Sequence, residues 1–199
     1  MIWPRKMNEE MKERGKRDIR KVCAVAAATV VAAACGKQQL QTTYDSQDKK
    51  IDSFIQSQIS SSKALRVYVN EGCSRLVIDE GVGEDSLSTS GTVSFFYAAY
   101  TFTGSLSQNN MFATNHEETA AQNGWDELSG EDFSPVIASL ADDKSLVEGL
   151  RKGLFGVKEG QECYIIFSGK HGFGSKPIGT IPANSALLYH VWIESIDNE

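Results

Sequence analysis

Alternating apolar and polar residues recur along the chain from residue 64 onward, a pattern that predicts β-strands. The segments LRVYVNEG and SRLVIDEG flank Asn70-Glu71-Gly72, whose residue types are typical of a hairpin turn. Further strands are predicted within GTVSFFYAAYTFTG at residues 91–104, QECYIIF and LLYHVWIESI. A polar loop leads from the first of these to MFATN at residues 111–115. The polar segment at residues 116–130 interrupts this series and is expected to be either a lid or an inert loop.

Two segments show helical spacing of apolar residues instead. The first is a short amphipathic pattern with Ile51, Phe54, Ile55 and Ile59 on one face. The second, at residues 143–154, carries Leu146, Val147, Leu150 and Leu154 on an inward face, and glycines follow it. Antiparallel strands with one short helix indicate an α+β architecture.

The N-terminal segment is typical of an exported protein. A basic stretch precedes VCAVAAATVVAAAC, which ends at Cys35 and is too short to span a bilayer. Small residues leading into a cysteine resemble a bacterial lipobox, although Ala32 occupies a position that is usually Leu. The alternative is an ordinary signal peptide with an incidental cysteine. We therefore expect a lipoprotein signal at residues 1–34, a polar tether with a short helix at 35–63, and a folded domain at 64–199.

Charge and cysteine content exclude several classes of function. The chain has 199 residues and a net charge of −6, and its basic residues gather in the leader, so we expect no nucleic-acid partner. Cys73 and Cys163 are too few for a disulfide framework. The three histidines and the cysteines lack metal-ligand spacing, so no metal site is predicted.

A glycine-rich loop precedes the last predicted strand, in SGKHGFGSKPIGTIPANSALLYHVWI at residues 168–193. It is not a dinucleotide loop, because a strand rather than a helix follows and no glycine stands three residues beyond Gly174. Gly169-Lys170 also lacks the flanking residues of a phosphate-binding loop. Nucleotide binding is therefore excluded here.

The C-terminal half resembles the FKBP-type peptidyl-prolyl cis-trans isomerases. The matching motifs are Leu146-Val147-Glu148-Gly149, the glycines from Gly153 to Gly160, Phe173-Gly174, Ile181-Pro182-Ala183-Asn184 and Leu187-Leu188-Tyr189-His190-Val191. TVSFFY at residues 92–97 and Phe112-Ala113-Thr114 match more loosely. The resemblance covers roughly residues 74–199 and implies an antiparallel β half-barrel wrapped around one short helix, with a ligand groove between them.

The resemblance also implies a site and a function. The catalytic positions would be Tyr97, Phe112, Phe173 and Tyr189, and the substrate-binding positions Phe133, Leu146, Val147, Leu150 and Ile181. The implied function is isomerisation of Xaa-Pro bonds in proline-containing polypeptides, assisting the folding of exported proteins without a cofactor or metal. With a lipid on Cys35, the protein would be anchored to a bacterial membrane in the cell envelope, its domain in the periplasm.

Three positions depart from the family pattern. Leu150 stands where the family commonly has Trp, Ala113 where it has Asp, and Phe173 where a Tyr hydroxyl donates a hydrogen bond to the ligand. Ala113 and Phe173 favour an alternative: a catalytically weak or inactive FKBP-like lipoprotein that binds peptides as a chaperone.

Overall fold

The structure, a computed structural model, describes residues 36–142 and 145–199. The chain forms two compact units, Met1–Thr43 and Tyr44–Glu199. In the first unit, the described residues 36–43 are helical. The leader expected at residues 1–34 and the lipidation site expected at Cys35 lie outside the described residues. None of the helices described is both long enough and apolar enough to cross a bilayer.

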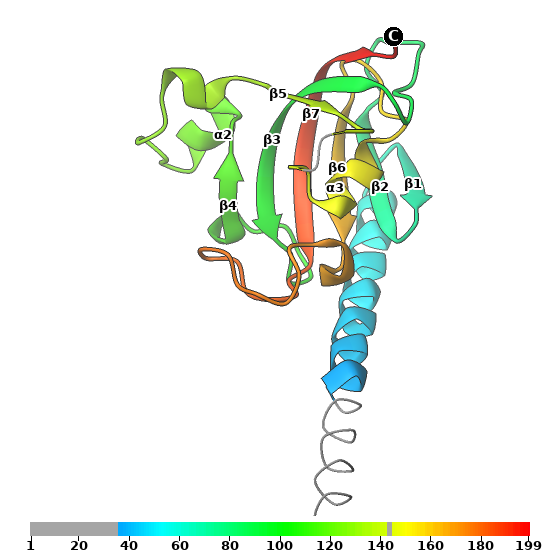
Figure 1. Ribbon diagram of the computed structural model, residues 1–199, viewed down its shortest axis with the longest axis vertical. Helices are drawn as coiled ribbons and strands as arrows, with labels where there is room; N and C mark the ends of the chain where they lie inside the picture. The colour runs from blue at the N-terminus through cyan, green and yellow to red at the C-terminus, as the bar shows by residue number, and fades with distance from the viewer. Residues whose placement is uncertain (1–35, 143–144) are drawn as a thin grey trace, which may run out of the picture. The chain divides into compact units, whose positions relative to one another are not determined.

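The second unit is built on one antiparallel sheet of seven strands (Figure 1). Six strands lie in the order β1-β2-β6-β7-β3-β4, and the seventh, β5, also pairs with β3. Their bounds are β1 Arg66–Asn70, β2 Cys73–Asp79, β3 Thr92–Thr101, β4 Met111–Thr114, β5 Val136–Ser139, β6 Glu162–Phe167 and β7 Leu187–Asp197. The strand patterns in the sequence predicted all of these strands except β4 and β5. Register shifts in β2 and β3 mark irregularities of the kind that bend a sheet.

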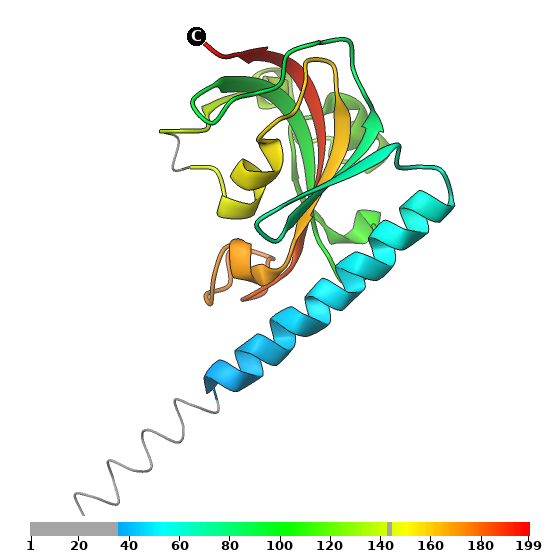
Figure 2. The same ribbon diagram turned by 90° about the vertical axis from the view of Figure 1, so that its right-hand side faces the viewer.

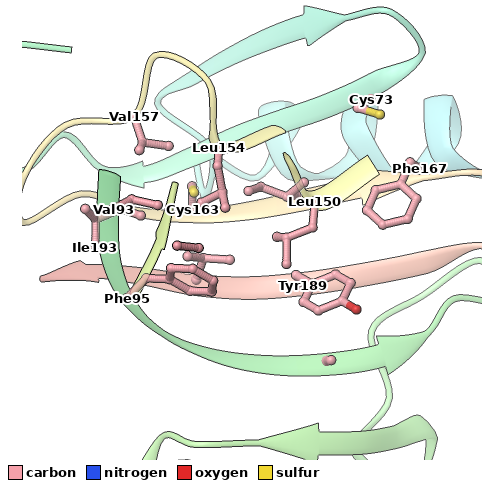
Figure 3. Packing of buried hydrophobic residues seen from close by; sticks show 14 of the residues in the cluster. Cys73, Val93, Phe95, Leu150, Leu154, Val157, Cys163, Phe167, Tyr189 and Ile193 are labelled. Atoms are coloured by element: carbon pink, nitrogen blue, oxygen red, sulfur yellow. The ribbon is translucent and has the colours of Figure 1, made fainter. Parts of the chain in front are cut away.

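The helix α3, Glu148–Leu154, packs on the inner face of the sheet. Figure 3 shows Leu150 and Leu154 pointing from α3 toward the side chains of β6 and β7. Glycines permit this close approach, because a Cβ on Gly149 would lie 2.3 Å from the ring of Phe167. The arrangement confirms the predicted half-barrel around a short helix.

The helix α3 is shorter than the segment predicted at residues 143–154. Val147, at its N-cap, has φ −59° and ψ 141°, so the helical conformation starts only at Glu148. Leu146 and Val147 therefore precede the helix, and both still pack against the inner core.

The two faces of the sheet bury separate apolar clusters, as strand alternation requires. The inner cluster contains Phe95, Ile165, Tyr189 and Val191 together with Leu150 and Leu154 of α3. The outer cluster contains Leu76, Ala98, Ile166 and Leu188, and a helix over residues 44–60 covers it with Ile51, Phe54 and Ile55 (Figure 2). Of the predicted apolar stripe, only Ile59 remains largely exposed, at 46%.

The helix over residues 44–60 changes the expected organisation of the N-terminal region. Residues 44–50, predicted to be part of an unpatterned tether, are helical and belong to the compact unit. The compact unit thus includes residues 44–63 together with the domain predicted at residues 64–199.

Shorter elements complete the unit. The polar segment at 116–130 includes helix α2, Glu117–Gln122, and 3-10 turns occupy Gln108–Asn110, Gly130–Phe133 and Gly169–His171.

Arg75 of β2, only 5% exposed, donates hydrogen bonds to the carbonyls of Gly153, Phe155 and Gly156 at the end of α3. A buried cation at these carbonyls satisfies groups that the helix leaves unpaired.

Candidate functional site

Tyr97 lies on the inner face of β3, where it is half-buried against the core. Its backbone is held firmly, since its N–H donates to Asn115 Oδ1 at 2.6 Å and its carbonyl accepts from Thr114 Oγ1 at 2.8 Å and from Asn115 N at 3.1 Å. Asn115 is itself buried and donates from Nδ2 to the Ser134 carbonyl at 2.9 Å. Thr114 and Asn115, at the end of β4 and just after it, therefore fix the backbone from which the Tyr97 ring projects.

Tyr189 of β7 contacts the rings of both Tyr97, on β3, and Phe112, on β4. The ring centroids of Tyr97 and Tyr189 are 6.0 Å apart, and those of Phe112 and Tyr189 are 6.4 Å apart with planes at 89°. These are favourable tilted and edge-to-face arrangements of aromatic rings. Tyr189 is 5% exposed, whereas Phe112 is only partly buried. The three rings therefore connect the buried core, at Tyr189, with the more accessible surface at Phe112.

Phe173 and Ile181 reach the same region from the glycine-rich loop. The rings of Phe112 and Phe173 lie edge to face with centroids 6.3 Å apart, and Phe173 is 38% exposed. Ile181 is buried in the inner cluster, and its backbone pairs with Ile178 across a short turn. We call Tyr97, Phe112, Phe173 and Tyr189 the aromatic site.

Apolar side chains at the start of α3 line the inner cluster beside the aromatic site. Leu150 is buried in the same cluster as Tyr189, and Leu146 and Val147 pack against that cluster. Figure 3 shows Leu150 projecting toward the ring of Tyr189. Eight of the nine residues proposed for the site thus belong to one connected apolar region.

Phe133 is the ninth, and the structure does not bring it to the aromatic site. It lines a separate pocket of about 410 Å³ with Phe96, His116 and Trp192. Phe96 and Trp192 follow the strand positions that face the outer side of the sheet. The long segment between residue 133 and α3, with β5 inside it, carries Phe133 to that side.

The electrostatics of the aromatic site favour neutral side chains. Burial raises the pKa of Tyr97 and, more strongly, that of Tyr189, because removal from water disfavours the phenolate. Burial also raises the pKa of Cys73 and Cys163 in the adjacent core to about 12. Both thiols are free and buried, so they act as small apolar side chains rather than nucleophiles.

Two structural residues of the site were not identified from the sequence. Phe167 is fully buried and stacks on Tyr189, with centroids 6.1 Å apart and planes at 18°. Its place on the inward side of β6, after Cys163 and Ile165, is a detectable signal. Asn115, which bonds to the Tyr97 backbone, directly follows β4, a position where short amides often bond to neighbouring backbone.

Metal-ligating side chains are not gathered anywhere in residues 36–142 and 145–199: no group of three or more His, Cys, Asp or Glu residues could hold an ion there. The outer-face histidines have other partners. His190 Nε2 lies 2.6 Å from Glu162 Oε1, and the ring of His116 stacks on Trp192 at 3.9 Å.

The comparison with protein-family models identifies one family. The family model for FKBP-type peptidyl-prolyl cis-trans isomerases matches residues 92–194, which is 103 of the 199 residues. A search of curated proteins returned no match.

Solved structures show a similar fold. A multi-domain immunophilin from Arabidopsis thaliana aligns with a TM-score of 0.52 and 22% identity over 67% of this chain and 46% of its own. The three FKBP domains of wheat FKBP73 align with a TM-score of 0.51 and 17% identity over 67% of this chain and 49% of theirs. The chain therefore spans about half the length of these two structures.

Proposed function

Because the chain belongs to the FKBP-type peptidyl-prolyl cis-trans isomerase family, we propose that it isomerises Xaa-Pro bonds in proline-containing polypeptides. The observation that carries this proposal is the convergence of Tyr97, Phe112 and Tyr189 on one apolar region whose outer ring, Phe173, is exposed. A proline ring would pack among these aromatic side chains, with Ile181 and Val147 beside it.

The chemistry needs an apolar surface rather than an acid or a base. Rotation about an Xaa-Pro amide is opposed by a barrier of about 18–20 kcal/mol, because amide resonance must be broken. In the twisted transition state the carbonyl loses dipole and the nitrogen becomes pyramidal. A dry aromatic environment disfavours the polar planar amide more than the twisted one, and each ~1.4 kcal/mol of this difference accelerates the reaction about tenfold.

Two substitutions favour a second candidate, a peptide-binding module of the same fold with little catalysis. Phe173 has no hydroxyl to donate to a substrate carbonyl, and Ala113, which packs at the edge of the inner cluster, has no carboxylate. A missing hydrogen bond is worth roughly 0.5–1.5 kcal/mol net, so its loss weakens binding without abolishing it. We therefore place the enzyme first.

A protease-coupled assay on a short Xaa-Pro-Phe peptide distinguishes the two candidates. We expect micromolar protein to shorten the slow phase, and Tyr97→Ala or Tyr189→Ala to reduce that effect while the domain stays folded by circular dichroism. Binding of the peptide without any change in the slow phase would favour the peptide-binding module. Full activity in both variants would show that the aromatic site is not where substrate binds.

We further propose that the protein acts on exported polypeptides as a lipoprotein of the bacterial cell envelope, anchored through Cys35, with its domain in the periplasm. The support is the sequence: a basic leader, a short apolar run and small residues before Cys35. Cys35→Ser is expected to move the protein from the membrane to the soluble fraction and to abolish labelling by a fatty-acid probe. Cys23→Ser is the control. Retention of Cys35→Ser in the membrane would refute the anchor.

A further inference from the structure

The side chain of Gln47 joins the two ends of the glycine-rich loop. Its Oε1 accepts a hydrogen bond from Gly169 N at 2.8 Å, and its Nε2 donates to the Asn184 carbonyl at 2.8 Å. The two loop ends are in direct contact, since a Cβ on Gly169 would lie 2.1 Å from the Asn184 carbonyl oxygen. One amide from a distant helix thus bonds to both sides of the loop's base.

Asn184 is the centre of this arrangement. Its N–H donates to the Gly174 carbonyl at 2.8 Å and closes the loop at a second point. Its side-chain Oδ1 accepts a hydrogen bond from the Tyr44 hydroxyl at 3.1 Å. With φ at +55°, Asn184 holds a left-handed conformation that few residues other than glycine adopt readily. The hydrogen bonds to Gln47, Tyr44 and Gly174 therefore stabilise Asn184 in this uncommon backbone conformation.

The helix that supplies Gln47 and Tyr44 is itself held on the sheet. Positions 44, 47, 51 and 54 follow one another at helical spacing, so the two polar residues continue the buried stripe of Ile51 and Phe54. The ring of Phe54 meets that of Phe102 edge to face at 5.4 Å. The helix thus offers a rigid base from which the two side chains hold the loop.

The loop carries two residues of the apolar region. Phe173 lies between Gly169 and the closure at Gly174, and Ile181 lies between that closure and Asn184. Phe173 reaches Phe112 only from this loop, and it remains 38% exposed. A change in the loop's base would therefore move the outer wall of the aromatic site.

We propose that Gln47 and Tyr44 are positioning residues that hold the glycine-rich loop, and with it Phe173 and Ile181, in the geometry that receives the proline segment. This inference rests on the function proposed above for the aromatic site. It assigns the N-terminal helix a role in substrate binding without any contact to substrate. Because a loosened loop lowers the fraction of protein competent to bind, the apparent affinity falls by the same factor.

The test uses the full chain in mild detergent and compares Gln47→Ala with Gln56→Ala, an exposed glutamine on the same helix. We expect Gln47→Ala to speed amide exchange of Gly169 by about tenfold or more, as local opening becomes easier. It should lower kcat/KM on an Ala-Leu-Pro-Phe peptide by roughly three- to tenfold, through KM rather than kcat. Gln56→Ala should match the wild type in both measurements.

Two further variants separate positioning from general stability. Gln47→Glu keeps an acceptor for Gly169 N–H but places a carboxylate against the Asn184 carbonyl, so it should keep the Gly169 protection and still raise KM. Tyr44→Phe removes one hydroxyl without threatening the fold, and we expect a smaller rise in KM, on the order of twofold.

The outcomes distinguish this inference from the proposed function. An active wild type with Gln47→Ala equal to Gln56→Ala in KM, or in Gly169 exchange, would overturn the positioning role alone. A wild type that neither binds nor isomerises the peptide, followed by NMR, would overturn the proposed function and the inference with it. If Gln47→Ala does not fold, the KM of Tyr44→Phe decides, and an unchanged value rejects the inference.

Discussion

Gly153→Ala is expected to destabilise the domain, although the same exchange stabilises most helices. Inside a helix, Ala is favoured over Gly by about 1 kcal/mol. Here the new Cβ would lie 2.1 Å from Ile165 Cγ2 and 3.1 Å from Cγ1, and Ile165 is fully buried in β6. Apolar carbons make optimal contact at about 3.5–4.0 Å, so α3 or Ile165 must move. Overpacking a core costs roughly 1–3 kcal/mol. With the cost at the upper end, the net loss is about 2 kcal/mol.

Urea denaturation followed by tryptophan fluorescence measures this loss directly. For a chain of this size, a loss of 1 kcal/mol in unfolding free energy lowers the melting temperature by roughly 2–4 °C. In thermal denaturation the melting temperature should therefore fall by about 4–8 °C. Gly36→Ala is the matched control, because a Cβ there meets nothing within 4 Å. Adding Ile165→Ala should make the double variant less destabilised than the sum of the two single variants. A Gly153→Ala protein as stable as the wild type would refute the close packing of α3 on β6.

Two other predictions concern buried charge. Arg75→Leu should reduce the free energy of unfolding by about 3 kcal/mol in urea titrations, because it leaves buried carbonyls at the end of α3 unpaired; a loss below about 1 kcal/mol would contradict this role. Burial, opposed by Glu162, lowers the pKa of His190 from its ordinary value of 6.5, so the unfolded chain takes up the proton first. Stability should therefore be complete above pH 6.5 and decline as the pH falls below it, and His190→Gln should flatten that decline. An identical pH slope in His190→Gln would show that His190 is not its source.

The inward alternation of β3 and β7 was readable from the sequence because each strand is long and faces apolar clusters on both sides. Alternation consequently places Tyr97 and Tyr189 on the same face of the sheet. In the structure Tyr97 pairs with Val191, and Tyr189 pairs with Ala99, two residues further along β3. The motif beginning at Leu146 was equally informative, although its first two residues precede the helix instead of opening it. Both features follow from the local order of residues, so a single sequence is enough to predict them.

The features that were not predicted depend on tertiary contacts. Residues 44–50 are polar in composition, so the sequence shows no apolar stripe there. Tyr44 and Gln47 continue the buried stripe of the helix only because the helix packs on the outer face of the sheet. Strands β4 and β5 are each four residues long, too short for alternation to stand out. Phe133, shortly before β5, lies in the pocket with Phe96 and Trp192 rather than at the aromatic site. The role of Arg75 was not predicted, because its carbonyl partners lie about 80 positions away along the chain and no local pattern indicates them.

The central claim is that the aromatic site accelerates prolyl isomerisation by an apolar environment alone. NMR exchange spectroscopy on an Ala-Leu-Pro-Phe peptide measures the cis–trans rate without a coupling protease. Uncatalysed exchange takes tens to hundreds of seconds. We predict a clear acceleration at micromolar protein whose kcat/KM stays constant from about pH 5.5 to 8.5, because burial raises the pKa of Tyr97 and Tyr189 and keeps both hydroxyls neutral. An exchange rate equal to that in buffer, or a bell-shaped pH profile, would contradict the claim.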